Sequence, residues 1–464
     1  MEKVLNERQG RTEPTGRMRR GLVCALALAG LFCGAESLSA AGPKEAEGLR
    51  EAQAAFEQRQ YDRALSALAP LLKEGSPSPD VSALAIKAFV KSGKPLDALK
   101  EYERLEAKRG KDDVPLLREV AIGFITPVLK DMREQMRGAG YTALKELHSD
   151  DVIPYLEDGL SDGSGLVRTL AAEGLGRLKT GQRSPRLREA VADQAAMVRA
   201  AALKGLGRSG DHSVMAVLEK SLTDEQASVR VAASGALVML GRAEAMGRIR
   251  EAADALNPED RGVAFRMLGD LKDRQSLPIL QKALSDTQPS VRGAAAMALG
   301  DLGSPDAVPA LLTALGDRMP AIRASAAISL GAIGSTDSVP ALKKAMADAN
   351  QAVRAAALAA LLRLGTPYGE CAEAVSALSG NTDPGTRAAV ARALGNGRDA
   401  EVIGALQLLL GDPLPRPRIA AARSLGQMGG KETIPILKKA LKDQDDAVRA
   451  TVGGALGRVL AAHQ

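Results

Sequence analysis

The chain has few aromatic residues and no tryptophan. Its 464 residues include 5 Tyr and 5 Phe, whereas an ordinary globular core uses large rings to fill space. A chain of this length must nevertheless bury a large apolar surface. Because 45% of the residues are hydrophobic and 25% are charged, the composition excludes a disordered or collagen-like chain. Ala, Leu and Val must therefore do most of the packing.

Histidine and cysteine are also scarce, and they are not arranged for chemistry. The 3 His residues, His148, His212 and His463, lie far apart, with no Cys or acidic residue near them at the spacing of metal ligands. The chain contains no GxSxG, Walker A or HExxH motif. We therefore expect no metal, no cofactor, no small-molecule substrate and no catalytic residue, as in a non-enzymatic protein.

Residues 1–41 have the pattern of a secretory signal peptide. Met18 begins a short basic segment, an apolar run follows at 21–34, and small residues continue to Ala41. The apolar run is too short to span a bilayer comfortably. Because the residues before Met18 are polar, Met18 is an alternative start of the protein. The pattern predicts an exported, periplasmic protein that is cleaved near Ala41.

An alternative to this cleavage is a lipoprotein anchored to the membrane through Cys33, at the end of the apolar run. Phe32 is bulky where lipoprotein signals have a small residue, which favours ordinary cleavage. Ordinary cleavage would leave Cys371 as the single thiol, with no internal disulfide. We expect Cys371 to be a buried small hydrophobe, and we expect membrane contact only if Cys33 is lipidated.

The charge of the chain is nearly balanced. It has 62 basic and 56 acidic residues, a formal charge of +6. Six of these basic and four of these acidic residues lie in 1–41, so the remainder of the chain carries +4. Such a mixed surface differs from the polycationic surface of a nucleic-acid-binding protein. We therefore expect a protein or peptide partner and no nucleic acid.

Residues 42–110 contain two helical units with a period of 34 residues. The segment 54–75 aligns with 82–105, so that Ala64 falls 34 residues before Ala98. This is the period of a tetratricopeptide helix pair, and the small and large packing positions of both units resemble that family. Both units lack the Trp of the family. A plain four-helix segment is the alternative.

The strongest pattern in the chain is an Arg that recurs every 31 residues, with one interval of 33. A Leu follows the Arg by seven residues in all eleven copies, and an Asp precedes it by six in nine of them. Chance does not produce such a lattice. The eleven arginines are Arg137, Arg168, Arg199, Arg230, Arg261, Arg292, Arg323, Arg354, Arg387, Arg418 and Arg449.

Each copy of this unit predicts a pair of antiparallel helices. Pro, or a capping Ser, Asn or Asp, begins the second helix just before the Arg, and Gly often ends it. Its apolar residues share one helical face, as in Val291, Ala295 and Leu299. A Gly also stands eight residues after the Arg in eight copies. Because Gly costs ~1 kcal/mol relative to Ala inside a helix, we expect it to permit close approach of neighbouring backbones.

These units resemble HEAT repeats, specifically the short type named from phycobilisome-lyase proteins, and residues 308–334 read almost as a consensus. The resemblance covers 114–463. It implies an all-α fold: an α-solenoid of stacked antiparallel helix pairs, with eleven units over 111–464 forming an arc on the order of 100 Å long. It also implies a scaffold or adaptor that binds a protein on its concave face. The family name leaves open a chromophore lyase or isomerase, and nucleic-acid binding is a third alternative.

The Arg row has two interpretations, a phosphate-binding stripe or a structural ladder. The ladder is favoured because the Asp in the preceding turn supplies an acceptor and cancels the field that would attract phosphate. The family resemblance implies that such Asp and Arg residues link adjacent repeats. The predicted ladder comprises Arg168, Arg199, Arg230, Arg292, Arg323, Arg354, Arg418, Arg449, Asp162, Asp193, Asp224, Asp286, Asp317, Asp348, Asp412 and Asp443.

Positions one, five and nine after the Arg share a helix face that is charged in the terminal repeats and apolar in the middle ones. The charged positions are Glu173, Arg177, Lys204 and Arg208 at one end and Arg392, Arg423 and Arg458 at the other. Exposed apolar residues in a basic frame indicate a groove for a protein partner. The alternative is that Met297 and Ile328 fill gaps between neighbouring helices. The candidate partner-binding residues are Val231, Met239, Met297, Ile328, Ala332, Arg363 and Arg392.

Overall fold

The computed structural model describes residues 43–73 and 77–463, and in these ranges it contains 26 α-helices and no strand. The predicted all-α class is therefore confirmed. The predicted signal peptide lies outside the described residues. The chain divides into two compact units, Met1–Leu84 and Ala85–Gln464, which are described separately.

The first unit contains a helical hairpin formed by α1 (Pro43–Glu57) and α2 (Tyr61–Lys73), followed by the start of α3 (Pro79–Lys91). At the turn of the hairpin, the rings of Phe56 and Tyr61 meet edge to face with centroids 5.3 Å apart. The unit boundary at Leu84 falls inside α3. The tetratricopeptide interpretation of residues 42–110 remains a prediction.

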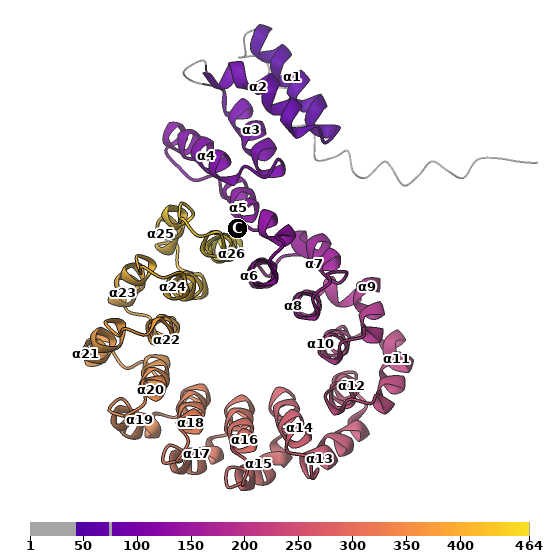
Figure 1. Cartoon of the computed structure of the whole chain (residues 1–464), viewed down its shortest axis with the longest axis vertical. Helices are drawn as coiled ribbons and strands as arrows, with labels where there is room; N and C mark the ends of the chain where they lie inside the picture. Colours follow the sequence, from indigo (N-terminus) through magenta and orange to yellow (C-terminus); the bar gives the residue numbers. More distant parts are fainter. Residues whose placement is uncertain (1–42, 74–76, 464) are drawn as a thin grey trace, which may run out of the picture. The chain divides into compact units, whose positions relative to one another are not determined.

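The second unit continues with α4 (Pro95–Arg109) and then consists of eleven helix pairs (Figure 1). The first, outer helices are short, and 3-10 turns such as η10 (Pro305–Ala307) precede several of them. They are α5 (Val114–Gly123), α7 (Ile153–Gly159), α9 (Pro185–Glu189), α11 (Met215–Lys220), α13 (Met246–Ala253), α15 (Leu277–Ala283), α17 (Val308–Ala314), α19 (Val339–Ala345), α21 (Tyr368–Ser379), α23 (Ala400–Leu410) and α25 (Thr433–Ala440).

The second helix of each pair lies on the inner side of the unit (Figure 1), and in ten of the eleven pairs it is longer than the first helix. The inner helices are α6 (Glu134–Glu146), α8 (Gly165–Leu175), α10 (Ala196–Gly207), α12 (Ala227–Met239), α14 (Pro258–Asp270), α16 (Pro289–Leu302), α18 (Pro320–Ile333), α20 (Gln351–Arg363), α22 (Pro384–Leu394), α24 (Pro415–Met428) and α26 (Asp446–Ala461). The prediction of an α-solenoid of helix pairs is thus confirmed.

The inner helices begin and end where the sequence places start and stop signals. Helix α16 has Pro289 at its first position and ends at Gly303, whose φ of 71° belongs to the left-handed region that favours Gly. Helix α20 is capped by Asn350, whose side chain accepts hydrogen bonds from the backbone N–H groups of Ala352 and Val353. Local sequence therefore sets the length of each inner helix.

Neighbouring inner helices approach so closely that their backbones meet at the recurrent Gly. A Cβ atom on Gly331 would lie 2.7 Å from the Cα of Ala360, and one on Gly207 would lie 2.6 Å from the Cα of Ala236. In both contacts the Gly stands eight residues after its Arg and faces the residue six after the next Arg. This close approach leaves no space for large rings between repeats and explains the shortage of aromatic residues.

The eleven pairs close into a ring, in which the last inner helix, α26, packs against α5 and α6 of the first repeat (Figure 1). A Cβ atom on Gly454 would lie 2.9 Å from the carbonyl oxygen of Ala143. Gly453 and Gly457 lie in similarly close contact with Ala121 and Leu147. The expected open arc is therefore wrong for residues 85–464. We call the contact of α26 and its neighbours α24 and α25 with α4–α6 the seam.

Ion pairs reinforce the seam. The ammonium group of Lys438 on α25 lies 2.6 Å from a carboxylate oxygen of Glu106 and 3.1 Å from one of Asp112. Lys442 lies 2.8 Å from Glu103 on α4. Burial alone would lower the pKa of Lys438, but its hydrogen bonds to Glu106 and Asp112 raise it overall. The first and last parts of the ring are thus joined by both backbone packing and charge.

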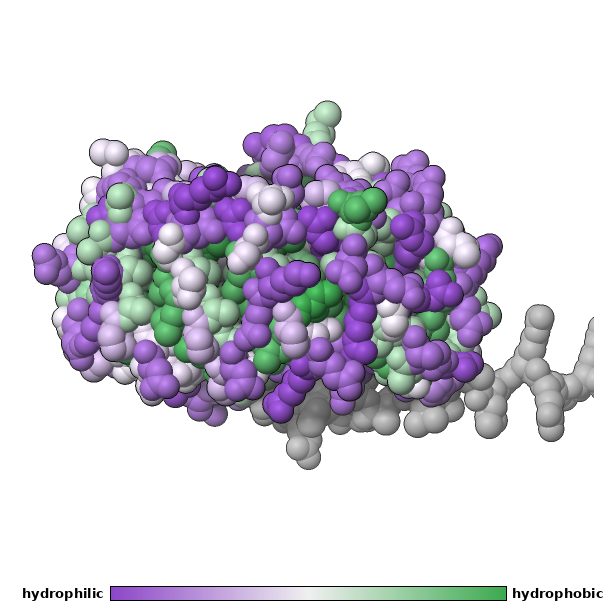
Figure 2. All heavy atoms as spheres, turned by 90° about the horizontal axis from the view of Figure 1, so that it is seen from below, coloured by the Kyte–Doolittle hydropathy of each residue, from purple (hydrophilic) through white to green (hydrophobic). Residues whose placement is uncertain are grey.

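Figure 2 views the structure from the side on which α15 and α17 lie, where hydrophilic residues predominate along the borders and paler or apolar residues lie between them. None of the helices in the described ranges is both long enough and apolar enough to cross a membrane.

Cys371 is buried and forms no disulfide, as expected, and burial raises the pKa of its thiol.

Candidate functional site

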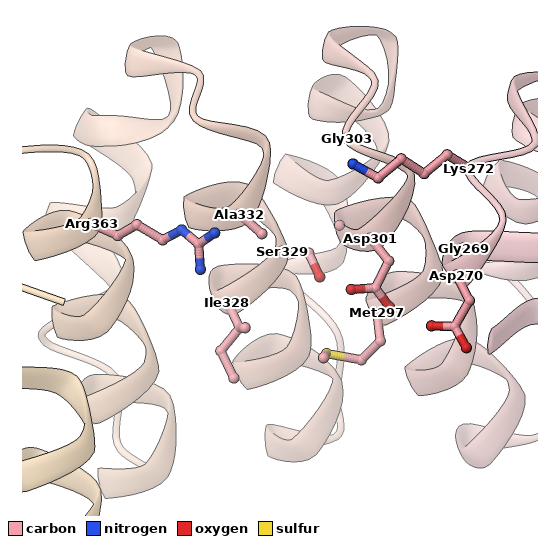
Figure 3. A pocket seen from close by; sticks show the side chains of 11 residues that line it. Gly269, Asp270, Lys272, Met297, Asp301, Gly303, Ile328, Ser329, Ala332 and Arg363 are labelled. Atoms are coloured by element: carbon pink, nitrogen blue, oxygen red, sulfur yellow. The ribbon is translucent and has the colours of Figure 1, made fainter. Parts of the chain in front are cut away.

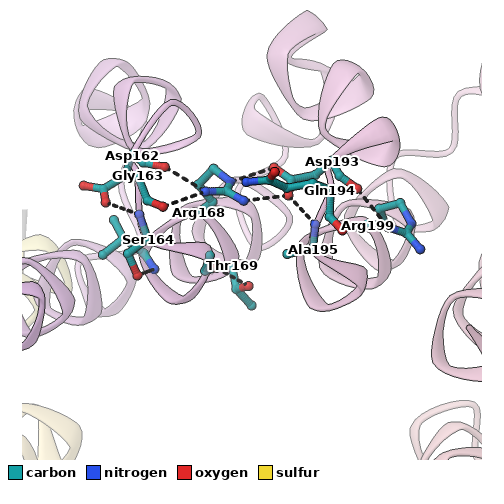
Figure 4. Close-up of polar contacts among 11 residues, drawn as sticks. Asp162, Gly163, Ser164, Arg168, Thr169, Asp193, Gln194, Ala195 and Arg199 are labelled. Atoms are coloured by element: carbon teal, nitrogen blue, oxygen red, sulfur yellow. Dashed lines mark hydrogen bonds and ion pairs between the residues drawn. The ribbon is translucent and has the colours of Figure 1, made fainter.

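The recurrent Arg side chains lie at the start of the inner helices and join adjacent repeats (Figure 4). The Nε and Nη2 atoms of Arg168 donate to the two carboxylate oxygens of Asp193, in the next repeat, over 2.7 and 2.8 Å. Its Nη1 atom donates to the carbonyl oxygen of Asp162, in its own repeat, over 2.8 Å. The backbone carbonyl of Asp162 thus accepts from Arg168 of its own repeat, while its carboxylate accepts from Arg137 of the preceding repeat.

This arrangement recurs along the ring. Each Asp also accepts a hydrogen bond from the backbone N–H two residues later, as in Met319 to Asp317 over 2.8 Å, which orders the turn before the helix. The hydrogen bond from Arg292 lowers the pKa of Asp317. The paired residues are Arg137 and Asp162, Arg168 and Asp193, Arg199 and Asp224, Arg261 and Asp286, Arg292 and Asp317, Arg323 and Asp348, Arg387 and Asp412, and Arg418 and Asp443.

Three predicted members of the ladder have no Asp of a following repeat. Arg230 faces the repeat in which Ala255 replaces the Asp, so its Nη1 atom contacts only backbone carbonyl oxygens. Arg354 precedes the longer, 33-residue interval, and its buried Nε atom has no hydrogen-bond partner among the described residues. Arg449 is the last Arg and pairs with Asp446 on its own helix. The ladder therefore has two internal gaps and stops at the seam.

Filling the gap in the ladder at Arg230 should make the protein more stable. We expect Ala255→Asp to stabilise the protein by about 1 kcal/mol, because the new carboxylate can accept from Arg230 and from the backbone N–H of Asn257. Chemical denaturation of the variant measures this change. Ala255→Asn is the matched control, since it can order the turn without supplying a charge. A carboxylate variant no more stable than the Asn variant would contradict the proposed geometry.

A hollow of about 450 Å³ lies on the inner helices α14, α16, α18 and α20 (Figure 3). It brings together Met297, Ile328, Ala332 and Arg363, four of the seven candidate partner-binding residues. Met297 and Ile328 are 36% and 44% exposed, and both extend from neighbouring helices toward the same side in Figure 3. The hollow therefore has an apolar part with a guanidinium group at one edge.

The opposite edge of the hollow is acidic, which was not predicted from the sequence. Asp270 and Asp301 line it together with Lys272. Burial and the nearby charge of Asp270 raise the pKa of Asp301. Asp270 pairs with Lys204 at 3.0 Å. These two acids stand nine residues after their Arg, as Arg363 does, so the same positional pattern contained the signal.

The other candidates lie elsewhere. Val231 is only 3% exposed and lines a smaller hollow of about 210 Å³ with Arg248 and Ala252 of α13. The expectation that Val231 is exposed on a groove is therefore wrong, because α13 and its own helix cover it. Met239 is half-buried and Arg392 is exposed, and neither lines the hollow of Met297.

No group of three or more His, Cys, Asp or Glu side chains within the described ranges is placed to hold a metal ion.

The two hollows differ in their chemistry. The larger one combines apolar, acidic and basic side chains, and the smaller one contains Arg230, Arg248, Glu251 and Asp260 around Val231. The larger hollow alone exposes large apolar side chains, and this makes it the candidate binding surface.

Solved structures with likeness to this chain include two enzymes and an engineered protein. Human deoxyhypusine hydroxylase in complex with glycerol is 24% identical, with a TM-score of 0.31 over 55% of this chain and 99% of that chain. The CpcE and CpcF complex of phycocyanin lyase from Nostoc sp. PCC7120 is 21% identical, with a TM-score of 0.33 over 56% and 92%. An engineered protein is 18% identical, with a TM-score of 0.27 over 73% and 98%. No curated protein sequence matches the chain.

Models of protein families also match the chain. A model of HEAT repeats matches residues 122–203, 246–319, 308–369 and 371–457, which span more than half of the chain. A model described as a HEAT repeat associated with sister chromatid cohesion matches residues 204–233. These matches agree with the helix pairs, the inter-repeat Arg and Asp pairs and the Gly contacts. The chain belongs to the HEAT repeat family.

Proposed function

We propose that the protein is a non-enzymatic scaffold or adaptor of the cell envelope that holds a segment of a partner protein in the hollow of α14–α20. The observation that carries this proposal is the exposure of Met297 and Ile328 side by side in a concave surface. Large apolar side chains that remain exposed in a hollow are typical of protein-binding surfaces. The signal-peptide pattern of residues 1–41 supports the envelope, with a Cys33-anchored lipoprotein as the alternative location.

The charges around the hollow define the chemistry of the partner segment. Asp301 is partly desolvated, and its charged form is disfavoured by Asp270, so a cation bound beside it would relieve both effects. Arg363 at the other edge favours an acidic group. The best occupant is therefore an amphipathic protein segment with an apolar side chain on Met297 and Ile328, a basic residue beside Asp301 and an acidic residue beside Arg363.

A photo-crosslinking amino acid at position 328 tests this proposal in intact cells. We expect it to capture a defined partner protein, which a probe at Leu408 does not capture, because Leu408 is 81% exposed but lies on the outer helix α23. The captured protein is then purified, and its affinity for the ring is measured.

We expect Met297→Glu with Ile328→Glu to weaken that affinity by more than about tenfold without lowering thermal stability, since both side chains are already partly exposed. The matched control is Met319→Glu with Leu408→Glu, which adds the same charge at exposed apolar positions outside the hollow. Unchanged affinity in the hollow variant, or an equal loss in the control, would refute the proposed binding surface.

A further inference from the structure

Closure of the ring joins two charged regions that an open arc would hold at opposite ends. Arg392, Arg423 and Arg458 belong to the last three repeats, and Arg177 belongs to the second repeat. They stand five or nine residues after their recurrent Arg, at the same positions as Met297 and Asp301 in the hollow, and therefore on the same inner face. Together with Arg416, which lies seven residues before Arg423 on α24, they form the seam cluster.

Glu146 on α6 shows that these cations meet across the seam. Its carboxylate lies 3.2 Å from Arg423 on α24. Burial raises the pKa of Glu146, and Arg423, Arg458 and Arg177 all lie close enough to act against that rise. Residues from the second, tenth and eleventh repeats thus surround one carboxylate of the first repeat. This neighbourhood exists only because α26 packs on α5 and α6.

Most of the positive charge in the seam cluster has no internal partner. The described residues provide no hydrogen bond or ion pair to the side chains of Arg392, Arg416, Arg458 or Arg177, although the carboxylate of Asp383 lies near Arg416. In contrast, every ladder arginine except Arg354 is held by a carboxylate or by carbonyl oxygens. The pKa of Arg392 is lowered by burial and by the charges of Arg416 and Arg423. Glu146 forms an ion pair with one of the five guanidinium groups, and Asp383 lies near a second, that of Arg416. The cluster therefore keeps a local excess of positive charge.

We propose that the seam cluster binds an acidic segment of a protein, whose carboxylates pair with Arg392, Arg416 and Arg458. Guanidinium groups bind carboxylates in bidentate geometry, and Arg is preferred wherever such planar recognition matters. Glu146 and Glu173 lie among the cations, which suits a segment with spaced acidic residues better than the continuous phosphate backbone of a nucleic acid. This surface lies outside the hollow of the proposed function and takes a ligand of opposite charge to the one that Asp301 favours.

The test measures fluorescence anisotropy of a labelled oligo-glutamate peptide titrated with the full chain at low and high salt. We expect saturable binding that weakens as salt rises. Arg392→Glu with Arg416→Glu should lower the affinity by about tenfold or more, because it replaces two cations of the cluster by two anions. These substitutions leave Arg423 and its contact with Glu146 intact, so the ring should keep its wild-type scattering profile.

The matched control is Lys282→Glu with Arg318→Glu, which makes the same change in net charge at exposed positions away from the seam. It should bind the peptide as tightly as the wild type. Met297→Glu with Ile328→Glu should also keep peptide binding, which separates this inference from the proposed function. Equal weakening in the control pair, or unchanged binding by the Arg392 and Arg416 variant, would overturn the proposal. Tighter binding of a single-stranded DNA oligonucleotide at the same cluster would overturn it in favour of nucleic acid.

Discussion

The Gly454→Leu variant should open the ring. A side chain at this position must meet the carbonyl oxygen and Cα of Ala143, 2.9 and 3.0 Å from the position of its Cβ atom. Backbone atoms cannot swing away as a flexible side chain can, so α26 has to separate from α6. Overpacking costs about 1–3 kcal/mol even where a core can adjust. We expect a loss of about 3 kcal/mol in unfolding free energy and a larger radius of gyration by small-angle X-ray scattering.

The control for this variant is Gly293→Leu. Gly293 also lies inside an inner helix, α16, but a Cβ atom there would have no neighbour within 4 Å. The substitution should leave the radius of gyration unchanged and should stabilise the helix by up to about 1 kcal/mol, because Leu is the better helix former. A Gly454→Leu protein with the same scattering profile as the Gly293→Leu protein would show that close packing at the seam does not hold the ring closed.

The second large effect concerns the inter-repeat ion pairs. Arg323 donates to both carboxylate oxygens of Asp348 over 2.7 and 2.8 Å, and both side chains are mostly buried. We expect Arg323→Ala to lower the unfolding free energy by about 2 kcal/mol, because hydrogen bonds to charged groups contribute about that much and Asp348 loses its partner. Chemical denaturation of Arg323→Ala, Asp348→Ala and the double variant measures the coupling. Additive losses would mean that the pair contributes nothing as a pair.

Arg230 provides the matched control, because it stands at the same helix position but contacts only carbonyl oxygens. Arg230→Ala should therefore cost less than Arg323→Ala. The loss should also depend on pH. The hydrogen bond from Arg323 lowers the pKa of Asp348 in the folded state, so the pair stabilises the protein above the unfolded pKa of about 3.9. As the pH falls through the lower folded value, Asp348 is protonated, and the part of the difference between wild type and Arg323→Ala that comes from the ion pair should disappear. The part that comes from the bond between Arg323 and the carbonyl oxygen of Asp317 should remain.

The helix pairs were predictable because each repeat contains its own signals. Pro289 and Gly303 mark the ends of α16, and the Gly eight residues after each Arg marks a backbone contact. The ladder was predictable in part. The sequence showed that an Asp precedes each Arg by six residues in most repeats. It did not show that the carboxylate of each Asp accepts from the Arg of the preceding repeat, whereas its backbone carbonyl oxygen accepts from the Arg of its own repeat. That distinction depends on how successive repeats are rotated, which no single repeat encodes.

The ring was not predicted, because closure is the sum of many small rotations between repeats. The sequence contains one local signal: α26 has two adjacent glycines, Gly453 and Gly454, before the usual Gly457. They form the close contact with α5 and α6. The contact is shifted by about one turn from that between other repeats, since Gly454, five residues after Arg449, faces Ala143, six after Arg137. Asp131 accordingly pairs with Arg133 and not with Arg449.

The candidate site was predictable to a similar degree. Helical spacing placed Met297, Ile328 and Ala332 on one face, and the structure brings them together in one hollow. The same spacing misplaced Val231, because the sequence does not show where an outer helix covers an inner one. The acidic edge at Asp301 was not predicted either, because acidic residues at these positions are also typical of an ordinary solvent-exposed helix face.

Zero-length crosslinking of the native protein tests ring closure most directly. A carbodiimide joins an amine to a carboxylate only when the two are in contact, and the ion pair of Lys442 and Glu103, at 2.8 Å, connects residues 339 positions apart. We expect mass spectrometry of the monomer fraction to identify this crosslink and the one between Lys438 and Glu106. An open arc would give neither crosslink in the monomer, or would give them only in a dimer fraction, and that result would contradict the closed ring.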